Sequence, residues 1–200
     1  CWSDDPAAVD QQLVAGSPLF VALGTEPGKV TGPTPEGCDR LFLETTADYV
    51  VVEADGARSM SFKAPAEHEP AIPGTSTLVV VVAAIDAVGR PVRAVAHRPE
   101  RVAAIARVGE DDVLAVPDLA SVLLHPEGGL KSIPTTARVA VVITRVDRAT
   151  AGLAADLGRA LAAVGALFLS FLVADQTIPL TWLPNPLSDL GGTWATWLVN

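Results

Sequence analysis

The sequence has few of the residues that build disulfide-linked or cysteine-metal proteins. Among its 200 residues are 2 cysteines, 1 methionine and 1 tyrosine. Cys1 and Cys38 form neither a CxxC pair nor a zinc-ligand spacing, which argues against a disulfide framework and a zinc site. Charged residues make up only 18%, and the net charge of −9 disfavours binding to nucleic acid or to an anionic membrane surface.

An apolar run long enough to cross a bilayer is also missing. The most apolar stretch, 160–174, contains Gly165 and Ser170 and falls short of the roughly twenty residues required. We interpret it as a helix end followed by a buried strand. No signal peptide is evident, so we expect a cytoplasmic protein. Because the chain begins at Cys1 and its methionine is Met60, we also expect a fragment that lacks its N-terminus.

Half of the residues are apolar, and most of these are alanine, valine and leucine. This composition predicts a packed globular fold. The length fits one domain. We expect residues 1–175 to form a partial α/β domain and residues 176–200, rich in tryptophan and proline, to form an atypical tail.

Three valine-rich runs, 49–52, 78–84 and 139–143, are apolar on both faces, which is typical of parallel strands covered by helices. A hairpin is predicted around the turn at 26–28. Helices are predicted at 6–16, 36–47, 99–107, 117–124 and 150–164.

Each valine-rich run ends in acidic residues: Glu53 and Asp55, Asp86, and Asp147. Open α/β sheets bind ligands beyond the carboxyl ends of their strands, so these residues predict one shared site. Asp147 follows its strand as the aspartate of a guanine-reading motif does. The alternative is that Asp147 caps the next helix.

The segment Glu53-Ala54-Asp55-Gly56 resembles a Walker-B strand end, in which one carboxylate holds Mg²⁺ and another orients the attacking nucleophile. In an extended strand Glu53 and Asp55 point the same way. Arg58 and Lys63 follow closely enough to contact phosphate. The alternative is a strand cap whose charges are simply solvated.

Two loops carry histidine. His68, between Glu67 and Glu69, is a candidate for acid–base or metal-ligand chemistry, although an ordinary loop histidine is the alternative. In the segment 125–131, Gly128 and Gly129 precede Lys131. The segment fails the phosphate-loop pattern because Leu130 intervenes and Pro134 follows, so we predict a glycine-rich turn at the mouth of the sheet.

In their order along the chain, these clusters resemble the YqeC family over about residues 17–150. The resemblance rests on the segments 48–58, 63–70, 86–91, 97–100 and 125–130. It implies a P-loop NTPase-like three-layer α/β domain with a mostly parallel sheet. It also implies a role as an accessory or maturation protein for selenium-dependent molybdenum hydroxylases, or in selenium-cofactor biosynthesis, with Mg²⁺ and ATP or GTP as cofactors.

On this resemblance we expect Glu53, Asp55, Arg58 and His68 to be catalytic, with Asp55 as the metal ligand. Lys63, Asp86, Asp147, Gly128 and Gly129 are expected to bind the cofactor, and the hydroxylase or its cofactor is the expected partner.

Two departures from the family pattern bear on activity. The N-terminal strand and Gly-rich Lys-Thr phosphate loop are absent, and Thr144-Arg145-Val146-Asp147 replaces Asn-Lys-Val-Asp. Without the amides that cradle phosphate, we expect the chain to lack NTPase activity alone. Two alternatives stay open: a non-catalytic chaperone that binds through 67–69 and 125–131, and an inactive truncated fragment.

Overall fold

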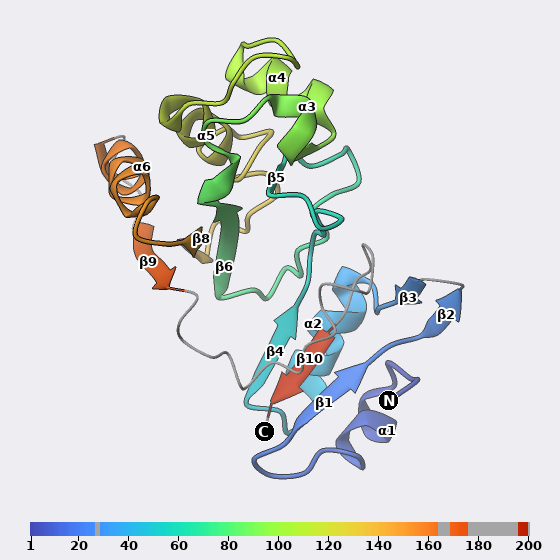
Figure 1. Cartoon of the computed structure of the whole chain (residues 1–200). Coiled ribbons are helices and arrows are strands. Elements are labelled where there is room, and N and C mark those ends of the chain that lie inside the picture. The colour runs from blue at the N-terminus through green and yellow to red at the C-terminus, as the bar shows by residue number, and fades with distance from the viewer. Residues whose placement is uncertain (27–28, 164–168, 176–195, 200) are drawn as a thin grey trace. The chain divides into compact units, whose positions relative to one another are not determined.

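In this computed structural model, the structure describes residues 1–26, 29–163, 169–175 and 196–199, which divide into two compact units (Figure 1). The first unit contains residues 1–58, 68–76 and 196–199, and the second contains 59–67, 77–163 and 169–175. The chain therefore passes between the units after Arg58, Glu67 and Ser76. The division predicted after residue 175 stays a prediction, because residues 176–195 lie outside the described part.

The first unit is built on a small antiparallel sheet. Strands β1 and β4 both pair with β10, which gives the order β1-β10-β4, and β2 and β3 form a separate antiparallel hairpin. The elements are α1 (Pro6–Asp10), β1 (Pro18–Val21), β2 (Gly24–Glu26), β3 (Lys29–Thr31), α2 (Pro35–Glu44), β4 (Tyr49–Val52) and β10 (Thr196–Val199).

Both helices of the first unit begin with a side-chain cap followed by a proline. The Asp5 carboxylate accepts from the Ala8 amide, and the Thr34 hydroxyl oxygen accepts from the Gly37 amide. Such caps satisfy amides that have no partner inside the helix, and proline suits the first helical position because it has no amide to satisfy. Fully buried apolar side chains from the helices and β1 then form a small core: Val9, Val21 and Leu41.

Asp39 on α2 holds the segment 68–76, which belongs to the same unit. Its carboxylate accepts from the Gly74 amide at 3.1 Å, the Thr75 amide at 2.9 Å and the Thr75 hydroxyl at 2.6 Å. Partial burial raises the pKa of Asp39, but the hydrogen bonds from Thr75 and Gly74 outweigh it and hold the pKa below 3.8. The fold thus favours the charged carboxylate.

The first unit should consequently lose stability in acid through Asp39. A pKa lowered by folding contributes stability that is present above the unfolded value and is lost as the pH falls through the folded value. We expect Asp39→Asn to cost about 1 kcal/mol at neutral pH and to flatten the loss of stability below pH 3.8. Urea unfolding between pH 2 and 7 measures this, with exposed Asp48→Asn as control. If the free energy of unfolding of Asp39→Asn fell with decreasing pH as steeply as that of the parent protein, this prediction would be wrong.

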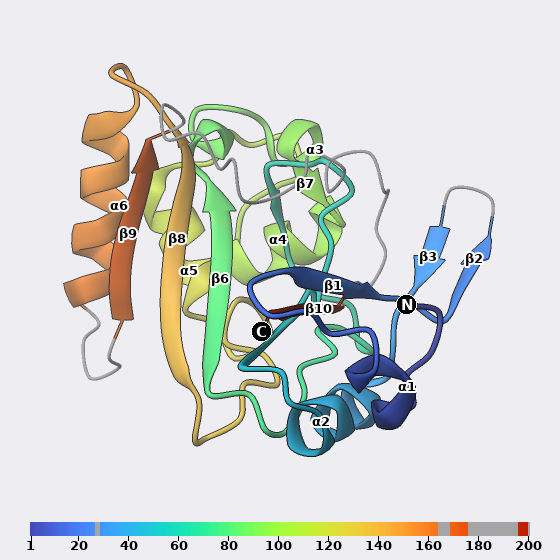
Figure 2. The ribbon, with the colours of Figure 1, turned by 90° about the horizontal axis from the view of Figure 1, so that it is seen from below.

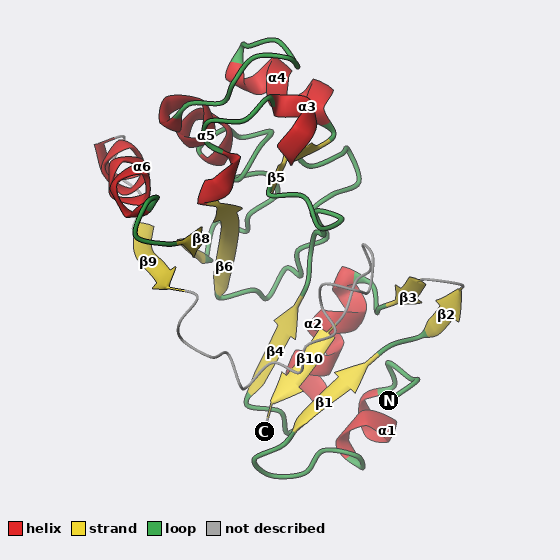
Figure 3. Ribbon diagram, viewed as in Figure 1, coloured by secondary structure: helices red, strands yellow, loops and turns green. Residues whose placement is uncertain are grey.

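The second unit contains the parallel strand pairs of the fold, and Figure 3 shows its helices in red and its strands in yellow. Strands β6, β8 and β9 form a parallel sheet in that order, and β5 pairs in parallel with β7. The elements are β5 (Phe62–Lys63), β6 (Leu78–Ala84), the 3-10 helix η1 (Ile85–Ala87), α3 (Val92–Val95), β7 (Ala96–His97), α4 (Pro99–Ala106), α5 (Val116–Leu123), β8 (Arg138–Val146), α6 (Ala151–Ala163) and β9 (Leu169–Asp175).

The core of this unit lies between its sheet and its helices. Val141 and Ile143 of β8 are buried in one cluster with Leu119 of α5 and Leu157 and Leu161 of α6. Figure 2 shows β6, β8 and β9 side by side with these helices. Alternate side chains point to opposite faces of a strand, so the valines between the buried ones face the other side of the sheet.

Two expectations about the valine-rich runs are wrong. Run 78–84 is not buried on both faces, because Val80 and Val82 are 47% and 60% exposed. Run 49–52 forms β4, but it pairs antiparallel with β10 in the first unit and does not join the parallel sheet. A short run of valines is compatible with either kind of strand, since β-branched side chains suit any pleated surface.

The helices predicted at 36–47, 99–107, 117–124 and 150–164 are present to within three residues as α2, α4, α5 and α6, whereas α3, β5, β7 and β10 were not predicted. Helix α1 ends at Asp10, whereas a helix to residue 16 was expected; Val14 instead forms an isolated bridge with Ser17. The helix end and strand expected within 160–174 are present as α6 and β9, and the hairpin turn at 27–28 lies outside the described residues. No helix among the described residues has the length and apolar character to span a membrane.

Candidate functional site

The carboxyl ends of β6 and β8 lie next to each other because Ala84 pairs with Thr144 in the parallel register. Just beyond them, Nη1 of Arg145 donates to Oδ2 of Asp86 at 2.9 Å and to Oγ of Ser61 at 3.0 Å. We refer to Ser61, Asp86 and Arg145 as the strand-end cluster. The sequence predicted that β6 and β8 would present polar residues at one edge, and in the second unit they do.

The Asp86 carboxylate depends on Arg145 for its compensating charge. Its Oδ1 atom is buried and has no hydrogen-bond partner among the described residues. The side chains of Asp86 and Arg145 are 34% and 42% exposed. A partly buried carboxylate that loses its cation keeps the desolvation penalty without the attraction, so this pair is costly to break.

Segment 59–67 reaches the same sheet edge. The Ala84 amide donates to the Ser61 carbonyl at 3.2 Å, which brings the Ser61 hydroxyl within reach of Arg145. Two residues further on, Lys63 of β5 pairs in register with His97 of β7. Lys63, predicted to bind phosphate, therefore lies on a short parallel strand pair of the second unit.

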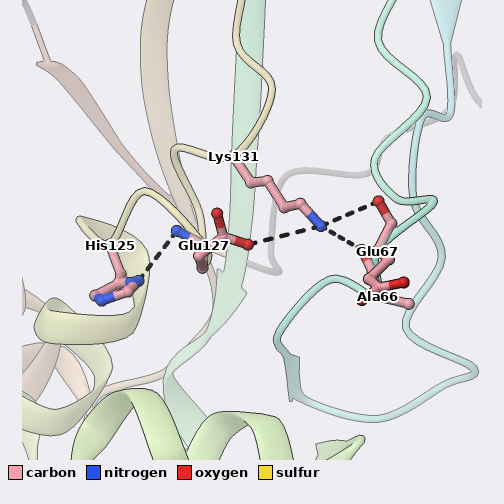
Figure 4. A network of polar contacts seen from close by, with 5 residues as sticks. All are labelled: Ala66, Glu67, His125, Glu127 and Lys131. Carbon is pink, nitrogen blue, oxygen red and sulfur yellow. Dashed lines mark hydrogen bonds and ion pairs between the residues drawn. The ribbon is translucent and has the colours of Figure 1, made fainter.

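Lys131 holds the end of this segment (Figure 4). Its Nζ donates to the carbonyl oxygens of Ala66 and Glu67 and lies 3.9 Å from the Glu127 carboxylate. The Lys131 side chain is only 11% exposed. The ammonium has three protons and three oxygen partners, so Lys131 ties segment 59–67 to the turn after α5.

The glycine-rich segment 125–131 is a turn, as predicted, and residues 132–137 lead into β8 without a helix. The Gly129 amide donates to the Val122 carbonyl at the end of α5. A Cβ on Gly128 would lie 2.1 Å from the Val122 oxygen, and one on Gly129 would lie 2.4 Å from the Leu123 oxygen. Close packing against α5 thus explains both glycines, and their binding of a cofactor stays a prediction.

Asp147 makes the contacts expected of a helix cap. Its Oδ1 accepts from the Thr150 amide and hydroxyl, both at 2.8 Å, just before α6 begins. The hydrogen bonds from the Thr150 hydroxyl and amide lower the pKa of Asp147 below 3.8. The geometry fits the capping alternative, and the reading of a nucleotide base by Asp147 stays a prediction.

The other predicted residues belong to the first unit. Glu53 and Asp55 follow β4 and are half-buried, and segment 68–76 returns beside them through the bond from the Ala71 amide to the Ala54 carbonyl. Arg58 is exposed with a φ of 49°. His68 is also exposed, and its Nε2 lies 3.7 Å from the Glu69 carboxylate.

The predicted site is therefore divided between the units. All four residues predicted to be catalytic lie in the first unit, and all five predicted to bind cofactor lie in the second. Within residues 1–26, 29–163, 169–175 and 196–199, no three His, Cys, Asp or Glu side chains are grouped to hold a metal ion.

Three residues of the second unit were missed by sequence reasoning. Arg145 was visible within Thr144–Asp147, but only as a departure from a lysine-containing motif. Lys131 was noticed as part of a failed phosphate loop, although its partners are carbonyls of a distant segment. Ser61 carries no sequence signal, because its role follows from where segment 59–67 meets β6.

Comparisons with known proteins agree on one relationship. A model of the family described as "YqeC protein" matches residues 2–100. The "Uncharacterized protein YqeC" of Escherichia coli (strain K12) is 37% identical over 148 residues, which cover 72% of this chain and 57% of that protein. The chain thus spans less than two thirds of this relative. No solved structure matches it.

Proposed function

The chain belongs to the YqeC family, and on that premise we propose that it serves as an accessory protein in the maturation of a selenium-dependent molybdenum hydroxylase. In its intact form the protein uses ATP or GTP, with Mg²⁺, for this step. The observation that carries the proposal is the parallel pair β6 and β8, which presents Asp86, Arg145 and Asp147 at its carboxyl ends. Open α/β sheets bind their ligands at that edge.

The proposal gives each residue a role. Asp55 holds Mg²⁺, Glu53 orients the attacking water or acceptor group, and Arg58, Lys63 and His68 line the substrate side. Asp86, Asp147, Gly128 and Gly129 contact the nucleotide. The half-buried Glu53 and Asp55 fit Mg²⁺, which needs only one or two protein carboxylates when phosphate oxygens and water complete its shell. The ion would neutralise charge on the phosphates.

Asp55→Ala tests the metal role. We expect the variant of the full-length protein to bind Mg²⁺-ATP or Mg²⁺-GTP about tenfold more weakly or worse, because the ion loses its direct ligand. Recovery of hydroxylase activity should fall with it. Asp48→Ala removes an exposed carboxylate just before the start of β4 and should change neither measurement. If Asp55→Ala retained both nucleotide binding and maturation, the assignment would be wrong.

One contact favours a second function, a chaperone that binds the hydroxylase or its cofactor without catalysis. Lys131 joins Glu67, the first residue of the loop 67–69, to the turn 125–131 within the second unit, so one residue of each loop proposed as a docking surface is held to the other. His68 and Glu69 belong to the first unit. A chaperone of this kind should retain the apo-hydroxylase in a pull-down without nucleotide. Capture that requires ATP or GTP would contradict it and favour the first proposal.

A further inference from the structure

We propose that Arg145 binds a phosphate group through Nε and Nη2, and that Asp86 and Ser61 hold its guanidinium in position for this contact. The inference rests on the proposed function only in taking a nucleotide as the natural source of the phosphate. Its own basis is the geometry of the strand-end cluster.

Two donor atoms of Arg145 lie outside its contacts with Asp86 and Ser61. Nη1 is committed to Asp86 and Ser61, whereas Nε and Nη2 make no hydrogen bond within the described part of the chain. These two atoms carry parallel N–H groups on one edge of the planar guanidinium. That edge matches two oxygens of a phosphate group, which is why arginine is common wherever phosphate is bound bidentately.

The backbone of Arg145 is held in an unusual conformation. Arg145 has a φ of 55°, in the left-handed region that glycine and asparagine adopt more readily. Residues kept in such conformations cost free energy, persist where surrounding contacts determine them, and cluster at functional sites. Arg145 lies where the register of β8 against β9 shifts between Ile143 and Val146. Its side chain is held by Asp86 and Ser61, so a ligand would meet a guanidinium already fixed in place.

Charge also favours this place for an anion. With a net charge of −9 the chain as a whole repels anions, so an anion site needs local donors. The ion pair between Nη1 of Arg145 and Oδ2 of Asp86 neutralises the Asp86 carboxylate. The Nε–Nη2 edge remains available at the carboxyl end of parallel strands, where ligands of α/β sheets bind.

Calorimetric titration of the full chain with pyrophosphate tests the site, with malonate as a carboxylate probe. We expect pyrophosphate to bind, and Arg145→Asn to weaken its binding about tenfold or more. Asparagine tolerates the left-handed backbone, so this variant should keep the fold. Arg145→Lys keeps the positive charge but lacks the two parallel N–H donors, so it should bind pyrophosphate with intermediate affinity. Arg148→Asn removes an exposed arginine nearby and should bind like the parent.

Asp86 is tested as a positioning residue by two substitutions. Asp86→Ala should lose pyrophosphate affinity, whereas Asp86→Asn should recover much of it because the amide oxygen still accepts from Nη1. The absence of pyrophosphate binding, equal binding of malonate, or parental affinity in Arg145→Asn would each overturn the proposal. Pyrophosphate binding that depends on Arg145 supports the site even if Asp55→Ala leaves maturation unchanged, which separates the two proposals.

Discussion

Gly128→Ala should destabilise the second unit by about 3 kcal/mol or more, the largest effect we expect from a single methyl group in this protein. The added Cβ would lie 2.1 Å from the Val122 carbonyl oxygen and 3.1 Å from its carbonyl carbon. Both are backbone atoms at the end of α5, so no side chain can rotate away to make room. Either the turn 125–131 must open or the last turn of α5 must unwind.

A second glycine provides the matched control. Gly152 lies in the first turn of α6, and a Cβ added there would have nothing within 4 Å, so Gly152→Ala meets no obstacle. It should stabilise the protein by about 0.5 to 1 kcal/mol, because alanine loses less backbone entropy than glycine in a helix. Urea unfolding measures both variants. Equal effects of the two alanines would show that the close approach to Val122 is not maintained in solution.

Lys131→Met should destabilise the second unit by about 2 kcal/mol, because hydrogen bonds from a charged donor are strong. Methionine keeps the apolar stem but removes the ammonium that holds the carbonyls of Ala66 and Glu67. The consequence should be local. Amides of β5, which precedes these carbonyls, should exchange with solvent faster than those of β8.

Arg148→Met is the control for charge. Arg148 is exposed and its removal changes the net charge by the same amount, but it holds no other segment of the described chain. Hydrogen exchange followed residue by residue distinguishes the two variants. Should β5 remain as protected in Lys131→Met as in Arg148→Met, the ammonium would not be what anchors segment 59–67.

Elements whose causes are local could be predicted from the sequence. Helix α2 begins with Thr34 followed by Pro35, and helix α4 begins at Pro99, so both starts were visible in a few residues. The parallel pairing of β6 with β8 was also predictable, since two long valine-rich strands separated by helices form crossover units. From that pairing, Asp86 and the end of β8 were expected at one edge.

Features that depend on distant segments could not be predicted. The partner of β4 is β10, which lies far from it in the sequence, and the valines of β4 carry no information about it. Arg145 presented a different difficulty. Sequence patterns assign left-handed backbone to glycine or asparagine, so an arginine with a φ of 55° leaves no signal, although that conformation accompanies its contact with Asp86.

The place of β10 in the first sheet determines when this unit can finish folding during synthesis. Strands β1 and β4 do not pair with each other; each pairs with β10, which is formed by Thr196–Val199. Among the described strands, β1 and β4 therefore have no partner in a nascent chain until Thr196–Val199 have left the ribosome, and contacts this distant in sequence form slowly. Exposed strand edges invite aggregation in that interval.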